Sequence, residues 1–173
     1  MAAAQATALI TGASAGIGRE LARVFAANGH PLALTARRKD RLDALAREIG
    51  TAYGVPVSVF AHDLEDPGAP VALHRAVTQA GIEVGILVNN AGFGTQGAFA
   101  TSDRAREEAL IAVNVLAPVK LAQLFLPAML KRGSGRILNV ASTAAFQPGP
   151  SMANYYASKA YWPAAGSVDT SLS

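Results

Sequence analysis

The chain has 173 residues, 51% of them hydrophobic and 16% charged, so it is long enough and apolar enough to bury the core of one globular domain. It has no cysteine, which excludes disulfides, thiolate catalysis and cysteine-ligated metal sites. Its net charge of +3 comes from 15 basic and 12 acidic side chains, an excess too small for a nucleic-acid-binding face.

The N-terminus and the histidines give no sign of targeting or of metal binding. The opening residues, MAAAQATALI, carry no basic segment ahead of their apolar residues, so no signal peptide is expected. No uninterrupted apolar run approaches the ~18 residues of a membrane-spanning helix. His30, His62 and His74 lie far apart, without the spacing of metal ligands. We therefore expect a cytoplasmic protein with no membrane segment, no nucleic-acid partner and no metal site.

Apolar runs alternate with helical patterns along the chain. Short buried strands are predicted over 6–11, 31–36, 55–60, 84–92 and 135–142. Helices are predicted from the first turn to about residue 29, over 39–50 with Gly50 as the stop, over about 67–80, and over about 102–131, where Pro118 should kink or split the helix. A last helix begins near Tyr155. Repeated strand–helix units predict a single α/β domain over 1–173, with a parallel sheet covered on both faces.

The turn after the first strand is rich in glycine and reads TGASAGIG from Thr11 to Gly18. Glycines let the backbone approach a pyrophosphate without a Cβ in the way, and the following helix offers free N–H groups and the positive end of its dipole. A glycine-rich turn without a ligand is the alternative, since the spacing differs from the common Gly-x-Gly-x-x-Gly. The position between an N-terminal strand and a helix favours a nucleotide site. We assign to it Gly12, Ser14, Gly16, Ile17 and Gly18.

The residues at the end of the second strand would determine whether NADP(H) or NAD(H) is preferred. An acidic residue about 20 positions after the glycines would bind the ribose 2′-OH. Ala36 stands there instead, and Arg37 and Arg38 follow it. Guanidinium groups suit a 2′-phosphate, because arginine binds phosphate with paired donors. NADP(H) is therefore favoured over NAD(H), although both arginines could instead be the solvated start of the next helix.

Two further strand ends carry polar or small residues. Asp63 and Leu64 follow the third strand, where the carboxylate could accept a hydrogen bond from the adenine amino group or could serve as a plain turn residue. The fourth strand ends in Asn89, then Asn90-Ala91-Gly92. Small residues there would let a cofactor lie against the backbone, and the asparagine amides could tie neighbouring strand ends together.

Tyr155 and Lys159 are four residues apart, so they share one face of the last helix. An ammonium close to a phenol favours the phenolate, which suits the tyrosine to acid/base chemistry. Tyr156 has Ala160 at the same spacing and lacks such a partner. Most Tyr-x-x-x-Lys pairs are surface helix residues, so this pair needs support from elsewhere in the chain.

Ser142 and Asn114 give that support. Ser142 follows the fifth strand, at the edge where ligands bind in open α/β sheets, and its hydroxyl could hold a carbonyl oxygen beside the tyrosine. Asn114 lies inside the long helix, where it could hold a proton-relay water or be a satisfied core asparagine.

Taken together, these motifs resemble the short-chain dehydrogenase/reductase family. TGASAGIG at 11–18, NNAG at 89–92, Asn114, Ser142 and YYASK at 155–159 come in the family's order and usual spacing, from about residue 6 to residue 160. The resemblance implies a Rossmann-like, doubly wound parallel sheet in three α/β/α layers. It also implies hydride transfer between NADP(H) and a ketone or aldehyde, with the alcohol as the reduced partner.

The resemblance also implies a role for each matching residue. Tyr155 would be the acid/base, and Lys159 would stabilise its phenolate and bond the nicotinamide ribose. Ser142 would orient the substrate oxygen, and Asn114 would hold the relay water. LTARRKDRL at 34–42 is similar to the NADP(H)-preferring members, but Ala15 stands where many of them carry a second basic residue. Selectivity would then rest on Arg37 and Arg38.

After residue 160 the resemblance stops. Family members typically continue for about ninety residues with two more strands and a substrate loop, so the last strands of the family fold are expected to be missing. Pro163 should end or kink the last helix, leaving residues 161–173 as an irregular tail. The fifth strand would form an apolar sheet edge. In the family the long helix and the catalytic helix usually form a homo-oligomer interface, which would be incomplete here.

Three readings of the function remain open. The first is an NADP(H)-dependent oxidoreductase, and the second is a nucleotide-binding remnant without turnover. The third is an interaction partner of a full-length relative. A small carbonyl or alcohol compound is the expected substrate, and Phe93, Phe146 and Pro148 indicate either an apolar substrate pocket or packing between loops.

Overall fold

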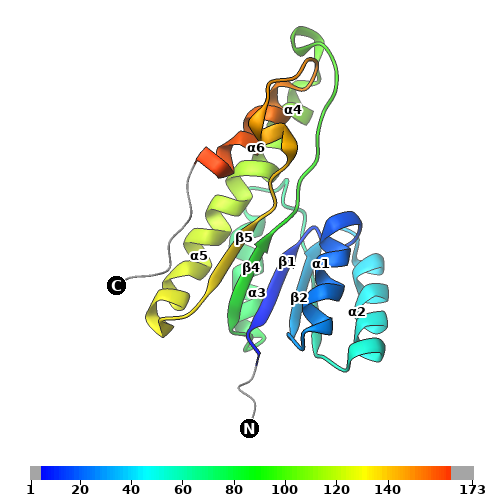
Figure 1. Cartoon of the computed structure of the whole chain (residues 1–173), viewed down its shortest axis with the longest axis vertical. Helices are drawn as coiled ribbons and strands as arrows, with labels where there is room; N and C mark the ends of the chain where they lie inside the picture. The colour runs from blue at the N-terminus through cyan, green and yellow to red at the C-terminus, as the bar shows by residue number, and fades with distance from the viewer. Residues whose placement is uncertain (1–4, 165–173) are drawn as a thin grey trace.

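A computed structural model of the chain describes residues 5–164. Five parallel strands form one sheet in the order β3-β2-β1-β4-β5 (Figure 1). The strands are β1 (Thr7–Thr11), β2 (Leu32–Ala36), β3 (Val57–Ala61), β4 (Val84–Asn89) and β5 (Arg136–Asn139). The strand order reverses between β1 and β4, which is the place where open parallel sheets bind ligands.

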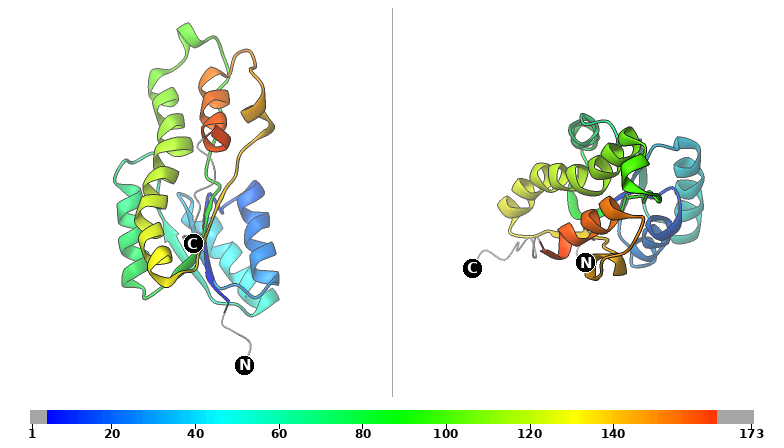
Figure 2. Two further views of the ribbon diagram at one scale, coloured as in Figure 1. Left: turned by 60° about the vertical axis from the view of Figure 1, so that its left-hand side comes forward. Right: turned by 90° about the horizontal axis from the view of Figure 1, so that it is seen from above.

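Helices cover both faces of this sheet (Figure 2). Ala8 and Ile10 of β1 face α1 and α2, whereas Leu9 faces α3 and α5, and all three side chains are fully buried. The helices are α1 (Gly16–Ala27), α2 (Lys39–Tyr53), α3 (Ala69–Gln79), α4 (Arg104–Ile111), α5 (Ala117–Arg132) and α6 (Ala153–Ala164), with short turns η1 (Phe99–Thr101), η2 (Ala112–Leu116) and η3 (Thr143–Phe146). The predicted doubly wound, three-layer α/β fold is confirmed.

Above the carboxyl ends of the strands, α4, α6 and η3 form an extension of the domain (Figure 1). The helical segment that reaches it runs from residue 104 to residue 132 and changes pitch in its middle. Here η2 is one turn of π-helix between α4 and α5. Pro118 lies in the first turn of α5, where a missing N–H is best tolerated. The predicted interruption is therefore present, but it lies just before the proline.

One predicted helix end is wrong, and another lies within one residue of its predicted place. Gly50 does not stop α2, which continues to Tyr53 and ends at Gly54 in a left-handed conformation with φ 67°. The last helix is predicted to end or kink at Pro163, and α6 is described to Ala164, one residue beyond the proline. Residues 161–164, expected in an irregular tail, are thus helical, and the rest of that tail lies outside the described residues.

The helix from Arg104 to Arg132 is long and apolar enough, by length and composition, to cross a membrane. The expectation of no membrane segment considered only uninterrupted apolar runs, and it did not consider the mean hydropathy of a whole helix. In the fold, however, Leu121, Phe125 and Met129 of this helix are buried against the sheet. It behaves as the core helix of an α/β domain.

As expected, β5 lies at the edge of the sheet among the described strands. Its single strand neighbour there is β4, and Leu138 is 42% exposed.

Candidate active site

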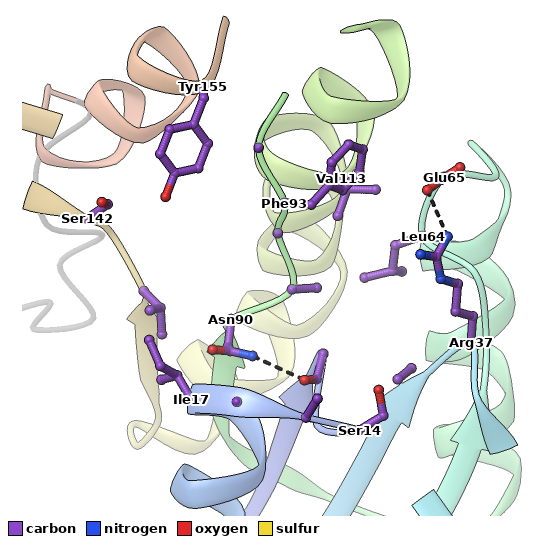
Figure 3. Close-up of a pocket in the computed structure, with 18 of the residues that line it drawn as sticks. Ser14, Ile17, Arg37, Leu64, Glu65, Asn90, Phe93, Val113, Ser142 and Tyr155 are labelled. Carbon is purple, nitrogen blue, oxygen red and sulfur yellow. Dashed lines mark hydrogen bonds and ion pairs between the residues drawn. The ribbon is translucent and has the colours of Figure 1, made fainter. Parts of the chain in front are cut away.

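A cavity of about 870 Å³ opens at the carboxyl ends of all five strands (Figure 3). It runs across the switch point between β1 and β4. Its lining includes all but two of the predicted site residues: Gly12, Ser14, Gly16, Ile17, Arg37, Arg38, Asp63, Leu64, Asn90, Ala91, Gly92, Ser142, Tyr155 and Lys159. Gly18 and Asn114 lie behind this lining. Segments more than a hundred residues apart in sequence thus form one site.

The floor of the cavity is the amino end of α1. No side chain caps this helix, so its first N–H groups face the cavity with the positive end of the helix dipole. Gly12 has φ 66°, and an added Cβ there would lie 2.8 Å from Ala91 Cα. Gly16 has φ 55° and open space around it. The turn is therefore shaped to bring its backbone against an anionic ligand.

Thr11 and Asn90 fasten the β1–β4 switch point. The Thr11 hydroxyl accepts hydrogen bonds from the backbone N–H groups of Asn90 and Ala91, both at 3.0 Å, and donates to the Val88 carbonyl at 3.2 Å. The Asn90 amide donates back to the Thr11 carbonyl at 2.8 Å. Asn89 likewise donates to Asn139 Oδ1 at 2.9 Å across to β5. The predicted tying of strand ends by asparagine amides is present in these contacts.

Arg37 and Arg38 lie in different environments. Arg38 Nη2 donates to Ser14 Oγ at 3.1 Å, next to the amino end of α1. Arg37 instead pairs with acidic side chains, with its Nη1 2.9 Å from Glu65 Oε1 and 3.8 Å from Asp63 Oδ2. Asp63 Oδ1 accepts the Glu65 N–H at 3.1 Å, as a turn residue does. Of the two arginines, only Arg38 has no carboxylate within ion-pair distance among the described residues.

The opposite side of the cavity holds Tyr155 and Ser142. Figure 3 shows the Tyr155 side chain pointing from α6 into the cavity, with Ser142 on the neighbouring segment. Ser142 Oγ accepts the Ala144 N–H at 3.2 Å, which leaves its own O–H available to another acceptor. Tyr156 projects elsewhere and packs against Gly149. The helix register therefore places Tyr155 in the cavity lining, which does not include Tyr156.

Lys159 is buried beneath the tyrosine. Its Nζ lies 5.9 Å from the centre of the Tyr155 ring and donates to the Val140 carbonyl at 3.2 Å. Burial lowers the pKa of this ammonium below its usual value. Gly92 gives it room, because an added Cβ would lie 3.3 Å from Lys159 Nζ and 3.1 Å from Asn114 Oδ1.

Asn114 does not reach the cavity with free groups. Its amide donates to the Phe93 carbonyl at 2.9 Å and to Ser158 Oγ at 3.0 Å, and its Oδ1 accepts the Phe93 N–H at 3.1 Å. Its own carbonyl accepts the indole N–H of Trp162 at 3.0 Å. The satisfied core asparagine, one of the two readings of this residue, is what these contacts show. Asn114 joins the loop after β4 to α6.

Sequence reasoning missed Glu65 and His62. Glu65 lines the cavity and accepts hydrogen bonds from both Arg37 and Arg106. His62, which has no metal-ligand spacing in the sequence, also lines the cavity, and burial lowers the pKa of its imidazole. Both residues are one or two positions from Asp63, so their place directly after β3 could have indicated that they belong to the site. Of the residues that indicated an apolar pocket, Phe93 lines the cavity and Phe146 is 78% exposed.

Comparison with known proteins identifies the family of the chain. The family model described as short chain dehydrogenase matches residues 6–163. A very-long-chain 3-oxoacyl-CoA reductase of Phaeosphaeria nodorum is 37% identical over 158 residues, which are 89% of this chain and 46% of the relative. The corresponding reductase of Anas platyrhynchos is 36% identical over 90% of this chain and 51% of its own length. The chain therefore spans about half the length of these curated relatives.

A solved structure supports the same relationship. A short-chain dehydrogenase from Sphingobium yanoikuyae, solved in complex with NADPH, has a TM-score of 0.84 and 40% identity, covering 90% of this chain and 60% of that one. The family match and the fold similarity both cover nearly all the described residues. The chain belongs to the short-chain dehydrogenase family.

Proposed function

We propose that the protein is an NADP(H)-dependent oxidoreductase that interconverts a ketone or aldehyde and the corresponding alcohol. The observation that carries this proposal is one continuous cavity that has an uncapped helix end and Arg38 on one side and Tyr155, Ser142 and Lys159 on the other. The Sphingobium yanoikuyae relative was solved with NADPH, and the Phaeosphaeria nodorum relative is named as a reductase of a 3-oxoacyl compound. These names support both the cofactor and the carbonyl chemistry.

The residues of the cavity fit a phosphorylated dinucleotide. The amino end of α1 suits a pyrophosphate, since its N–H groups are uncapped and Gly16 leaves the approach open. Arg38 and Ser14 suit a 2′-phosphate. Leu64, Ala91 and Gly92 add small or apolar surface to the cavity lining. When bound, the nicotinamide supplies the hydride for reduction or accepts it in oxidation.

Tyr155 and Ser142 act on the substrate oxygen in this proposal. In the reductive direction the carbonyl carbon gains the hydride, and Tyr155 gives its phenolic proton to the oxygen that becomes the alcohol. Ser142 donates its free O–H to the same oxygen and holds it during the transfer. The Lys159 ammonium stabilises the phenolate that Tyr155 leaves behind. Asn114 serves as a positioning residue, because its bonds hold Phe93 and Ser158 in place.

The first experiment is a parallel titration of the purified protein with NADPH and NADH, followed by the fluorescence of the reduced nicotinamide. We expect saturable binding that favours NADPH and weakens about ten- to a hundredfold in Arg38→Ala, since a charge-assisted phosphate contact contributes about 1.5–3 kcal/mol. Tyr155→Phe should bind NADPH as the wild type does and should lose carbonyl-dependent NADPH oxidation. Absence of saturable binding would refute the proposal. Binding without turnover on a panel of ketones, aldehydes and 3-oxoacyl thioesters would favour a nucleotide-binding protein without catalysis.

A further inference from the structure

Four side chains form a continuous chain along one flank of the cavity. Arg37 bonds Glu65 Oε1 at 2.9 Å, and Arg106 Nη1 bonds the same oxygen at 3.1 Å. The Arg106 guanidinium in turn lies 3.7 Å from the centre of the Phe93 ring. These residues come from the ends of β2, β3 and β4 and from α4, so the chain joins four separate segments. Figure 3 shows its Arg37–Glu65 pair on the side of the cavity away from Tyr155.

Glu65 is held in place from both sides. Its side chain is 31% exposed, whereas those of Arg37 and Arg106 are 56% and 43% exposed. The position of Arg106 is restricted in turn, because the Phe93 ring holds its guanidinium by a cation–π contact. The Phe93 backbone is itself fixed by Asn114. The carboxylate is therefore a fixed negative charge next to Arg37.

This arrangement determines which arginine a phosphate can use. Arg37 already has Glu65 and Asp63 as ionic partners, while Arg38 lies on Ser14 beside the cavity floor. A phosphate that recruited Arg37 would have to displace Glu65 and would lie close to its negative charge. The repulsion between the carboxylate and a phosphate opposes that exchange.

We propose that Glu65 is a specificity-determining residue that withholds Arg37 from the 2′-phosphate of the cofactor. This inference rests on the proposed function, since it concerns the adenosine end of the same site. The preference for a 2′-phosphorylated adenosine is then set by Arg38 and Ser14, and Arg37 contributes only when the negative charge of Glu65 is removed. The wild-type preference for NADP(H) is accordingly smaller than a pair of adjacent arginines would produce.

The test uses adenosine 2′,5′-bisphosphate and adenosine 5′-monophosphate as probes, titrated by calorimetry at fixed ionic strength. Neither probe needs the nicotinamide end or turnover. Glu65→Gln keeps the size of the side chain and removes its charge. We expect it to bind the bisphosphate about fivefold more tightly than the wild type, which is the scale of a partly exposed charge interaction. Its affinity for the monophosphate should change less than twofold.

Two controls identify the cause. In an Arg37→Ala background, Glu65→Gln should give no gain, because no arginine is released. Glu83→Gln removes the same charge at the opposite end of the sheet, where Glu83 pairs with Arg132, and should leave both affinities unchanged. Thermal unfolding of each variant confirms that it is folded.

Unchanged or weaker bisphosphate binding in Glu65→Gln would overturn the inference, since Glu65 would then be neutral or would orient Arg37 toward the phosphate. A gain that persists in the Arg37→Ala background would overturn it as well. In both cases wild-type NADPH binding and turnover would leave the proposed function standing. A wild-type protein that binds neither probe nor NADPH would refute both.

Discussion

The indole N–H of Trp162 donates a hydrogen bond to the backbone carbonyl of Asn114 at 3.0 Å. In a regular α-helix that carbonyl would accept from the residue four positions on, but this residue is Pro118, which has no N–H. The proline therefore cannot donate the regular helix hydrogen bond to this carbonyl. Trp162 supplies that donor, and the last turn of α6 is thereby fastened to the middle of the long helical segment.

Trp162→Phe should lower the free energy of unfolding by about 1 kcal/mol, because it keeps an aromatic ring and removes the donor to the Asn114 carbonyl. Urea unfolding followed by circular dichroism measures the change. Tyr161→Phe is the control, since it alters the neighbouring aromatic residue at a side chain that is 42% exposed. Equal stability of the two variants would show that the indole N–H contributes nothing.

Thr11 and Thr35 form a matched pair at one register position of β1 and β2. Both are buried, but the Thr11 hydroxyl has three hydrogen-bond partners, while Thr35 Oγ1 has none among the described residues. Thr11→Val leaves two backbone N–H groups without an acceptor and should cost about 3 kcal/mol. Thr35→Val should be neutral or stabilising by about 1 kcal/mol. Chemical denaturation of both variants checks the contrast, which a similar loss in each would contradict.

Gly92→Ala should damage the site through crowding. The new Cβ would press on Lys159 Nζ and Asn114 Oδ1, and overpacking of this kind costs about 1–3 kcal/mol. We expect a lower melting temperature and about tenfold weaker NADPH binding. Gly50→Ala is the control, because an added Cβ meets nothing within 4 Å inside α2 and should stabilise the helix by about 1 kcal/mol. If Gly92→Ala matched the wild type in both measurements, the crowding argument would be wrong.

Lys159 predicts a pH dependence of stability. Burial lowers its pKa in the folded protein below the ordinary value of 10.5, so the unfolded chain binds this proton more strongly. The free energy of unfolding must then rise with pH between the lowered pKa and 10.5. The difference in stability between the wild type and Lys159→Met should therefore shift in favour of the wild type from pH 7 to pH 10, as measured by urea unfolding. Lys131→Met, at an exposed lysine, is the matched control variant. Parallel curves for the wild type and Lys159→Met would contradict this linkage.

Much of the fold could be predicted because its signals are local. The apolar strands, the TGASAGIG turn and the four-residue spacing of Tyr155 and Lys159 each follow from neighbours in sequence, and the structure has them where expected. Helix ends were harder. Gly50 is tolerated inside α2 because Leu42, Leu45 and Ile49 remain buried on one face, and Gly54 offers the left-handed ending.

The contacts between distant elements could not be predicted. Whether Arg37 faces a phosphate or Glu65 depends on how the ends of β2 and β3 lie next to each other, and both choices fit the same sequence. The role of Asn114 depends in the same way on the loop at Phe93 and on the last turn of α6. Side-chain partners with such large sequence separations have no periodic pattern that would reveal them.

The central position of β1 has a consequence for the order in which the molecule assembles. One neighbour of β1 is β2, the next strand along the chain. The other neighbour is β4, which lies much later in the sequence: Thr11 and Val88, which share a hydrogen bond between these two strands, are 77 residues apart. During synthesis β1, β2 and β3 can pair first, and β1 then has an open edge until β4 emerges from the ribosome. β1 contains the apolar residues Ala8, Leu9 and Ile10, and an unpaired apolar strand is a template for aggregation. The central strand of the sheet is thus open to aggregation until β4 has been made.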